Sequence, residues 1–417
     1  MTHPPERVVI VGAGECGIRT AVNLREHRWG GALIVIGEEP EVPYERPPLS
    51  KVGIDPTHSA GSPPIVPADR FAELDLEFIR GTAVATIDRE HRTVIVDDGQ
   101  AVPYDRLVLA TGARARRPAI VGGDAILTLR TVADLRKLRH QLTPGARLVV
   151  IGGGFIGLEV AAGAVERGCE VVVLEFAHQL MSRVVPAMVA NVVELRHREA
   201  GVDLRLGIGV ESIESVGTRH RLQLTDGSSI SCDVVVAGVG ALPNTELAAA
   251  CGLMVDNGIA VDSHLCTSDP AIFAGGDCCS FPHPLYGDRR IRLEAWRNAV
   301  EHAEVLAANV LGGERVCDTV PWFWSDQYEL GLQIAGLHAA AVHDVVRRRP
   351  DGAEVRFGLN YDGRLVSASG VAEGTSIAKD IRLAEMLIAH RATPRVTELA
   401  DPSFNLRSLL KDGRGES

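Results

Sequence analysis

The chain has 417 residues, 46% hydrophobic and 23% charged, with a formal net charge of −11 at pH 7. This length predicts two or three domains, and the acidic balance argues against nonspecific nucleic-acid binding. No apolar run approaches the ~18 residues of a membrane span, and charged Glu6 and Arg7 interrupt any signal-peptide pattern. We therefore expect a cytoplasmic protein without a membrane or nucleic-acid partner.

The first predicted strand, at residues 8–11, leads into the glycine-rich motif GAGECG at 12–17, and a helix is expected from 15 to 27. A strand, a glycine turn and a helix in this order set a dinucleotide pyrophosphate against helix N-terminal amides. The next strand, at 33–36, ends before Glu38. That acid lies about 20 residues after the motif, where a carboxylate meets a ribose hydroxyl, and no basic residue follows closely.

A proline-rich loop, RPPLSK at 46–51, follows this unit. Its prolines exclude a regular helix or a central strand, so a rigid loop that presents Arg46 and Lys51 is expected. Only four of the 43 basic residues are lysines, so a lysine at this position hints that a compact ammonium is needed. Such a loop suits the clamping of a cofactor.

The segment that follows is predicted to alternate between loops and short strands. Residues 55–70 are rich in Pro, Ser, Thr and Gly and indicate an irregular surface loop. Residues 92–96 and the turn at 97–99 predict half of a β-hairpin. A strand at 107–110 ends at Thr111 and Gly112, where small residues let the backbone approach a ligand closely.

A second glycine-rich motif, GGGFIG at 152–157, follows the apolar run 148–151. The strand after its helix ends at Glu175, again about 20 residues beyond the motif, at the ribose-binding offset. Phe176 follows that acid, where a basic residue would favour a phosphorylated ribose, so NADH is favoured over NADPH. His178 and Arg183 lie close enough to leave NADPH open.

Between this unit and the C-terminal region, two further strands are predicted. Asp226 and Gly227 indicate a hairpin turn, and 232–237 a buried strand that runs into the glycines up to Gly240. A short strand at 272–274 ends in glycines and Asp277. That carboxylate could bond a sugar or ribityl hydroxyl, or simply end the strand.

The C-terminal residues differ in composition. Residues 321–328 contain four aromatic side chains, a strand is expected at 355–359, and a helical pattern runs from 377 to 390. These features predict a separate α+β domain.

The eight cysteines show no Cys-x-x-Cys or Cys-x4-Cys spacing and no spacing with histidine that suggests a metal. We expect reduced thiols, with the adjacent Cys278 and Cys279 serving as packing residues. Arginine clusters at 114–117, 289–292 and 347–349 are interpreted as solvated surface, with docking of an acidic partner as the alternative.

Two dinucleotide motifs in one chain suggest that one cofactor passes electrons to the other. The chain resembles the FAD-dependent, NADH-dependent ferredoxin reductases of bacterial Rieske dioxygenase and cytochrome P450 systems. The resemblance covers nearly the whole chain and rests on both glycine motifs and on the segments 46–51, 110–112, 272–277, 294–296 and 321–327. The proline loop and the tryptophan-rich segment are the most family-specific of these.

This resemblance implies an α/β fold with two Rossmann-like dinucleotide-binding domains of the glutathione-reductase type and a C-terminal α+β domain. The implied FAD-binding domain comprises 1–110 and 246–320, the NAD-binding domain 111–245, and the C-terminal domain 321–417. The implied reaction passes hydride from NADH to FAD and then single electrons to a small iron–sulfur ferredoxin, expected to be of the 2Fe–2S type.

The resemblance also assigns residues. Cofactor binding would fall, on the FAD side, to Gly12, Gly14, Cys16, Gly17, Glu38, Arg46, Lys51, Arg130, Asp277 and Trp296, and on the NADH side to Gly152, Gly154, Gly157, Glu159 and Glu175. Further cofactor contacts are expected at Val84, Thr111, Gly112, Arg183 and Gly240. Lys51 and Glu159 would be the catalytic pair, although a carboxylate in a first helical turn can also serve only the helix dipole.

The chain departs from the family pattern at Cys16, where relatives usually carry a small residue, and at 370–379. We therefore expect cofactor chemistry to follow the family while partner recognition differs. Residues 289–297 and Trp324 are the candidates for a ferredoxin-docking face. A rubredoxin or quinone acceptor, or a flavoprotein used for interaction or signalling, are the alternatives. A thiol-based reductase is disfavoured because the proline loop holds no cysteine.

Overall fold

A computed structural model describes residues 5–55, 57 and 61–412 of the chain. The chain forms two compact units, which are described separately. The first comprises Met1–Glu45, Pro63–Arg114 and Leu242–Thr319, and the second Arg46–Ser62, Ala115–Ala241 and Val320–Ser417. The three domain boundaries expected from the sequence remain a prediction. Among the described residues, no helix is long and apolar enough to cross a membrane.

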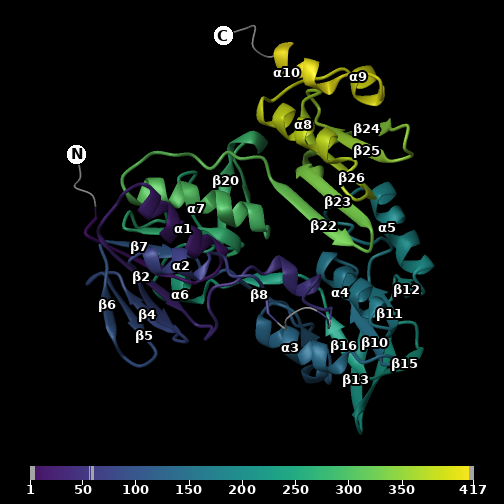
Figure 1. Cartoon of the computed structure of the whole chain (residues 1–417), viewed down its shortest axis with the longest axis horizontal. Helices are drawn as coiled ribbons and strands as arrows, with labels where there is room; N and C mark the ends of the chain where they lie inside the picture. The colour runs from purple at the N-terminus through teal and green to yellow at the C-terminus, as the bar shows by residue number, and fades with distance from the viewer. Residues whose placement is uncertain (1–4, 56, 58–60, 413–417) are drawn as a thin grey trace. The chain divides into compact units, whose positions relative to one another are not determined.

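The first unit is built on a parallel five-stranded sheet in the order β19-β7-β1-β2-β3. Its strands are β1 (Arg7–Val11), β2 (Ala32–Gly37), β3 (Glu77–Arg80), β7 (Arg106–Leu109) and β19 (Ile272–Ala274). Helices α1 (Glu15–Glu26) and α7 (Trp296–Val310) pack against each other (Figure 1). The strands expected at 8–11, 33–36, 107–110 and 272–274 and the helix behind the first motif are thereby confirmed.

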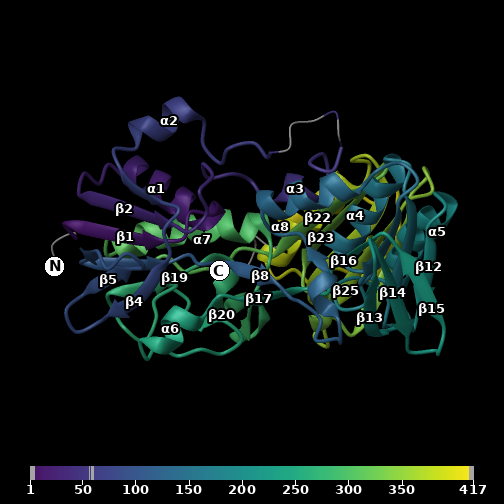
Figure 2. The same cartoon turned by 90° about the horizontal axis from the view of Figure 1, so that it is seen from below.

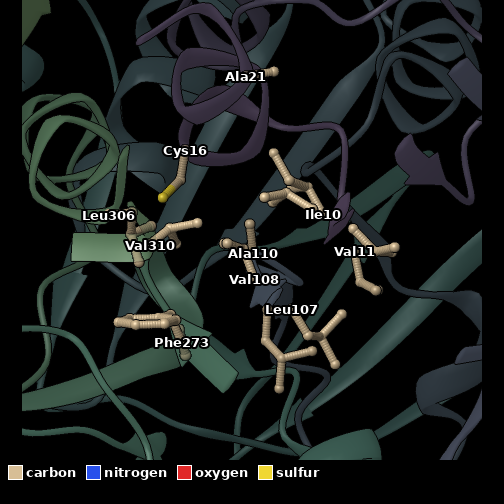
Figure 3. Packing of buried hydrophobic residues seen from close by; sticks show 14 of the residues in the cluster. Ile10, Val11, Cys16, Ala21, Leu107, Val108, Ala110, Phe273, Leu306 and Val310 are labelled. Carbon is tan, nitrogen blue, oxygen red and sulfur yellow. The ribbon is translucent and has the colours of Figure 1, made fainter. Parts of the chain in front are cut away.

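The central strands of this sheet are buried on both faces, as expected of parallel strands with continuous apolar runs, while the edge strand β3 is not. Val8, Val9 and Ile10 have no exposed surface, and the neighbouring strand contributes Leu107 and Val108. Figure 3 shows this core, with the Cys16 side chain directed from α1 towards Leu306 and Val310 of α7.

Shorter elements complete the first unit. The predicted hairpin is present as β5 (Thr93–Val96) and β6 (Ala101–Pro103), which join β4 (Val84–Asp88) in a three-stranded antiparallel sheet. The others are α2 (Ala68–Glu73), α6 (Glu246–Ala250), β18 (Ile259–Ala260), β20 (Cys279–His283) and β21 (Arg289–Ile291). Two of the five passages of the chain between the units fall within β8 (Ala113–Ala115) and β17 (Ala241–Pro243).

The irregular surface loop expected at 55–70 needs correction at its end. Ile65 and Val66 are buried, and α2 begins at Ala68 rather than after residue 70. These two apolar side chains join the core of the first unit, so the segment is tied down before the helix. Residues 56 and 58–60 of the expected loop lie outside the described residues.

The second unit contains a second parallel sheet in the order β12-β11-β10-β16-β9. Its strands are β9 (Leu127–Thr128), β10 (Arg147–Ile151), β11 (Glu170–Glu175), β12 (Asp203–Leu206) and β16 (Val234–Ala237), and its helices α3 (Val132–Gln141), α4 (Phe155–Glu166) and α5 (Ala187–Glu199). A smaller antiparallel sheet lies beside it, made of β13 (Val210–Val216), β14 (Arg219–Leu224) and β15 (Ser229–Cys232) (Figure 2).

The turn at Asp226 and Gly227 is confirmed between β14 and β15, but the single strand expected at 232–237 is two strands. Cys232 ends β15, and β16 begins only at Val234. Asp233 breaks the run because its backbone N–H donates to the Arg147 carbonyl while its carboxylate accepts the Arg147 N–H at 2.8 Å. Asp233, hydrogen-bonded to the first residue of β10 through both its backbone and its side chain, thus separates two sheets.

The C-terminal region of the second unit is an antiparallel five-stranded sheet in the order β22-β23-β26-β25-β24. Its strands are β22 (Trp322–Gln327), β23 (Leu330–Gly336), β24 (His343–Arg348), β25 (Glu354–Leu359) and β26 (Leu365–Glu373). Helix α8 (Ala378–Ala389) packs on this sheet (Figure 1), followed by α9 (Val396–Ala400) and α10 (Leu409–Asp412). The predicted α+β character, with a strand at 355–359 and a helix from 377, is confirmed.

The interpretation of residues 347–349 as solvated surface is wrong for Arg347. Its side chain is 6% exposed, and its guanidinium donates to the carbonyls of Leu399, Pro402 and Phe404 at 2.8–3.3 Å. Asp380, also buried, lies 3.9 Å away. This arginine therefore fastens the segment after α9 to β24, while Arg348 stays 73% exposed.

We predict that Arg347→Leu lowers the thermal midpoint of the protein by about 5 °C or more. Leucine removes the donor to three backbone carbonyls, and each buried acceptor left without a partner costs about 1–3 kcal/mol, while Asp380 keeps Arg349 at 2.9 Å. Arg348→Leu is the matched control, since an exposed pair contributes at most about 1 kcal/mol. Equal midpoints for the two variants in a thermal melt followed by circular dichroism would contradict this account of Arg347.

Candidate functional site

The first glycine motif forms a turn that only glycine can build. Gly12 has φ +112°, and a Cβ there would collide with the carbonyl oxygen of Ala110. A Cβ on Gly17 would collide with the carbonyl of Gly12. In contrast, nothing lies within 4 Å of the Cβ position of Gly14. The first and third glycines thus close the turn and the helix–strand contact, while the second borders open space.

Helix α1 begins at this turn without a side-chain cap. Its N-cap residue is Gly14, which makes no side-chain cap hydrogen bond. Free amides at a helix N-terminus beside open space form an anion-binding site. The residues present therefore fit the pyrophosphate of a dinucleotide.

Two further residues of the first motif are polar or titratable. Burial raises the pKa of Glu15, although its ion pair with Arg19 at 2.8 Å opposes the shift. Burial also raises the pKa of the Cys16 thiol well above its usual range, so that thiol stays protonated. Because the Cys16 side chain points into the core (Figure 3), a cofactor contact at this position would fall to its backbone.

The other FAD-side residues of the first unit occupy strand ends and a helix start. Glu38 lies exposed directly after β2, Asp277 lies partly exposed after β19, and Trp296 begins α7. Val84 begins β4. Their assignments to FAD, like those of the motif residues, remain predictions.

Thr111 and Gly112 follow β7, as expected, but the Thr111 hydroxyl already has a partner. It donates to the Asn244 carbonyl at 2.7 Å, and the Asn244 amide donates to the Thr111 carbonyl at 2.8 Å. Gly112 has φ +64°, a conformation that favours glycine. This exchange fixes the backbone after the strand.

The second glycine motif repeats the same construction in the second unit. Gly152 has φ +104°, and a Cβ there would lie 2.7 Å from the Gly238 carbonyl oxygen, while a Cβ on Gly157 would collide with the Gly152 carbonyl. The closest atom to a Cβ on Gly154 is the Gly238 carbonyl oxygen, at 3.5 Å. Helix α4 also starts at Gly154 without a side-chain cap, so the residues present here also fit a dinucleotide pyrophosphate.

Glu175 lies at the edge of this second turn. Its carboxylate accepts the Gly153 N–H at 2.6 Å and the Ala177 N–H at 2.7 Å. The neighbouring Phe176 is 76% exposed. Arg183 is exposed, with a guanidinium nitrogen 3.6 Å from the Cβ position of Gly240. The structure therefore brings the expected acid to the glycine turn and brings Arg183 and Gly240 together.

The proline loop is part of the second unit and forms a short 3-10 helix, η1 (Pro47–Ser50), in agreement with the exclusion of a regular α-helix. Arg46, just before it, donates to the backbone carbonyl of Arg130 at 2.7 Å. These two expected FAD-side residues are therefore neighbours.

Lys51, just after η1, lies between two carboxylates. Its ammonium is 2.8 Å from Oδ2 of Asp326 and 3.8 Å from Oε1 of Glu159. It also sits over the ring of Trp324, 4.9 Å from the centroid. The expected pairing of Lys51 with Glu159 is thus present as an ion pair, but Asp326 is the nearer partner.

Glu159 is buried in α4, which differs from a carboxylate that merely serves the helix dipole. The Ser325 hydroxyl donates to its Oε1 at 2.6 Å, and the Ser50 hydroxyl donates to its Oε2. Burial raises the pKa of Glu159, while the Lys51 ammonium and the two hydroxyls act in the opposite direction. The side chain is therefore a buried carboxylate surrounded by donors.

Ser50, Ser325 and Asp326 were not assigned a role from the sequence. A signal for Ser325 was present: Ser325 and Gln327 alternate in β22, so two polar side chains share one face of a strand, and both are buried. Asp326 points the other way and carries no comparable signal. Only the folded strand brings it to Lys51.

The candidate docking residues are already engaged within their own units. Arg292 pairs with Glu294 at 2.6 Å and Arg297 with Glu301 at 2.9 Å, while Arg290 donates to the Ser280 carbonyl. Trp324 stacks on Trp322, with ring centroids 5.4 Å apart.

All eight cysteines are free thiols, and Cys278 and Cys279 are fully buried, which confirms the packing interpretation. Among the described residues, no group of three or more histidine, cysteine or acidic side chains is placed to hold a metal ion.

Comparisons with known proteins agree with this geometry. Residues 6–303 match the pyridine nucleotide-disulphide oxidoreductase family, and residues 322–410 match a reductase C-terminal domain. The chain is 42% identical to the ferredoxin–NAD(+) reductase component of an anthranilate 1,2-dioxygenase system from Burkholderia cepacia, over 96% of this chain and 98% of that protein. It is 38% identical to putidaredoxin reductase from Pseudomonas putida, over 99% and 98% of the two chains.

A solved structure, that of a covalent putidaredoxin reductase–putidaredoxin complex, matches with a TM-score of 0.91 and 37% identity. The match covers 99% of each chain. The expected fold, with two dinucleotide-binding parts of the glutathione-reductase type and a C-terminal α+β part, is confirmed.

We predict opposite outcomes for alanine at two glycines of the first motif. Gly12→Ala should destabilise the protein by more than about 2 kcal/mol, because it combines positive φ with a backbone collision. Gly14→Ala should reduce the FAD content of the purified protein, because its methyl group enters the open space beside α1, and should leave the thermal midpoint of the flavin-free protein unchanged. Full flavin content in Gly14→Ala, read from the visible absorbance ratio, would show that this space holds no cofactor.

Proposed function

Because the chain belongs to the pyridine nucleotide-disulphide oxidoreductase family and carries the reductase C-terminal domain, we propose that it is an NADH-dependent, FAD-containing ferredoxin reductase. It takes reducing equivalents from NADH and passes electrons to a small iron–sulfur ferredoxin that feeds an oxygenase or a cytochrome P450. The relatives described above are named for reductases of this kind.

The observation that carries this proposal is the pair of uncapped glycine turns, one in each unit. Each has a second glycine at an uncapped helix N-terminus, with nothing within 4 Å of the Cβ position of Gly14 and only the Gly238 carbonyl oxygen, at 3.5 Å, near that of Gly154, which suits one dinucleotide per unit. Bound FAD supplies the exchange between a two-electron hydride donor and a one-electron acceptor.

The residues around these turns have distinct roles in the proposal. The α1 turn holds FAD, and the α4 turn holds NADH, with Glu175 on the ribose and Phe176 in place of a basic residue. Lys51 would supply the positive charge that stabilises a cofactor gaining negative charge on reduction, and Glu159 and Asp326 hold its ammonium in position. No side chain needs to act as a general base, because hydride transfer moves no separate proton.

The choice of acceptor is tested by turnover. We predict that the holoenzyme with NADH reduces cytochrome c rapidly only when a 2Fe–2S ferredoxin is added, and more slowly as ionic strength rises. Equal rates without ferredoxin would contradict the proposal. Activity restricted to a rubredoxin or a quinone would replace the acceptor while keeping the NADH-dependent flavoprotein. No turnover with any acceptor would favour an interaction or signalling role.

We predict that Lys51→Met slows NADH-driven flavin reduction about ten- to hundredfold in anaerobic stopped-flow measurements. A hydrogen bond or ion pair to a charged group is worth about 1.5–3 kcal/mol, and about 1.4 kcal/mol corresponds to a tenfold change in rate. Lys137→Met is the control, because Lys137 is exposed on α3. An unchanged rate in Lys51→Met would remove Lys51 from the mechanism.

A cytoplasmic location belongs to the proposal as well. It rests on the expectation from the sequence, and cell fractionation with an activity assay would test it.

A further inference from the structure

A series of hydrogen bonds continues from Oε1 of Glu159, the oxygen that also faces Lys51, through β22 into α5. The Ser325 hydroxyl donates to Glu159 at 2.6 Å and accepts from the Gln327 amide nitrogen at 3.1 Å. The Gln327 amide oxygen lies 2.9 Å from Nε2 of His197. Nδ1 of His197 lies 3.3 Å from the Tyr328 hydroxyl.

The direction of each of these bonds follows from the carboxylate at one end. An ionised carboxylate only accepts, so Ser325 must donate to Glu159 and can only accept from Gln327. The amide nitrogen of Gln327 therefore faces Ser325, and its amide oxygen must accept a hydrogen bond from the Nε2–H of His197. Nδ1 of that imidazole is then the acceptor for the Tyr328 hydroxyl. Burial lowers the pKa of His197, which favours this neutral form.

Water cannot replace the inner members of this chain. Ser325 and His197 have no exposed surface, and Gln327 is 3% exposed. A donor or acceptor that loses its partner at such a site bears its full desolvation penalty. While Glu159 is ionised, every donor in this series therefore has an acceptor only when the bonds run from Tyr328 towards Glu159.

Tyr328, the last residue of this hydrogen-bonded series, lies in a turn with an unusual backbone conformation. Tyr328 follows β22 with φ +55°, in a two-residue connection to β23 where glycine is favoured. The Arg196 guanidinium lies 4.2 Å from its ring centroid and pairs with Glu329 at 2.6 Å. Bulky residues rarely adopt positive φ unless their surroundings impose it, so the tyrosine is held against His197.

We propose that His197 and Gln327 are positioning residues for the Lys51–Glu159 pair. They hold the Ser325 hydroxyl as a donor to Glu159, which favours the ionised carboxylate and keeps it oriented towards the Lys51 ammonium. The inference deepens the proposed function, and it rests on that function only for its kinetic consequence. The charged or titratable groups that face these hydrogen-bonded residues are Lys51 and Asp326 at one end and Arg196, Tyr328, Glu166 and Glu329 at the other.

The matched variants are His197→Leu and His197→Gln. Leucine removes the donor, so the Gln327 amide can flip and draw the Ser325 hydroxyl away from Glu159. Glutamine restores an N–H donor at a similar reach. Gln327→Glu tests the same point from the other side, because the introduced carboxylate competes with Glu159 for the Ser325 hydroxyl.

The primary measurement is the ¹⁵Nζ spectrum of the lysine-labelled holoenzyme. The chain has only four lysines, so the Lys51 signal can be assigned with Lys51→Arg. We expect that signal to move in His197→Leu and Gln327→Glu, to return in His197→Gln, and the Lys137 signal to stay unchanged throughout. NADH and ferredoxin are absent from this measurement, so a failure of the proposed acceptor would not affect its result.

The kinetic measurement is the pH profile of NADH-driven flavin reduction. Loss of one hydrogen bond to a carboxylate should move the acid limb of that profile up by about half a unit to one unit in His197→Leu, and His197→Gln should reverse the shift. Should His197→Leu fold poorly, Tyr328→Phe, which removes only one hydroxyl, should give a smaller shift in the same direction. A lowered thermal midpoint with an unmoved Lys51 signal and an unmoved acid limb would overturn the proposal.

Discussion

The buried carboxylate of Glu159 is the constraint on which the second unit depends. Transfer of an ionised carboxylate from water to the interior is costly unless donors surround it. Here the donors come from segments far apart in the chain: the Ser50 hydroxyl from the proline loop and the Ser325 hydroxyl from the first strand of the C-terminal sheet. The loop, α4 and β22 therefore have to meet for this charge to be tolerated.

The same requirement shapes the proposed reaction. Lys51 directly follows Ser50, whose hydroxyl donates to Glu159. Asp326 contacts Lys51 from β22, the strand that also supplies Ser325. A positive charge held in this way needs no rearrangement when negative charge develops on a cofactor. The contacts that bury Glu159 thus also place the ammonium, and the hydrogen bonds through Gln327 and His197 extend the same buried network.

Much of the fold could be predicted because its signals are local. The two glycine turns follow from positions such as Gly12 and Gly152, where backbone geometry excludes other residues, and parallel strands show as apolar runs. The site was only half predictable, because Asp326 and Ser325 reach Lys51 and Glu159 through tertiary pairing. Arg347 resembles any surface arginine until the chain beyond α9 covers it. The division at Asp233 depends on a bond to a different strand.

The central claim, that Glu159 is a buried carboxylate whose charge is disfavoured by burial, is tested most directly by comparing Glu159→Gln with the natural protein across pH. Burial raises the pKa of Glu159 in the folded protein. The protonated side chain therefore contributes stability at pH values below the pKa of an unperturbed glutamate. This contribution is lost as the pH rises through the raised pKa. Glutamine cannot lose a proton. The thermal midpoint of Glu159→Gln minus that of the natural holoenzyme should therefore increase as pH rises from about 4.5. A difference that stays constant, or that changes in the opposite direction, would contradict the account.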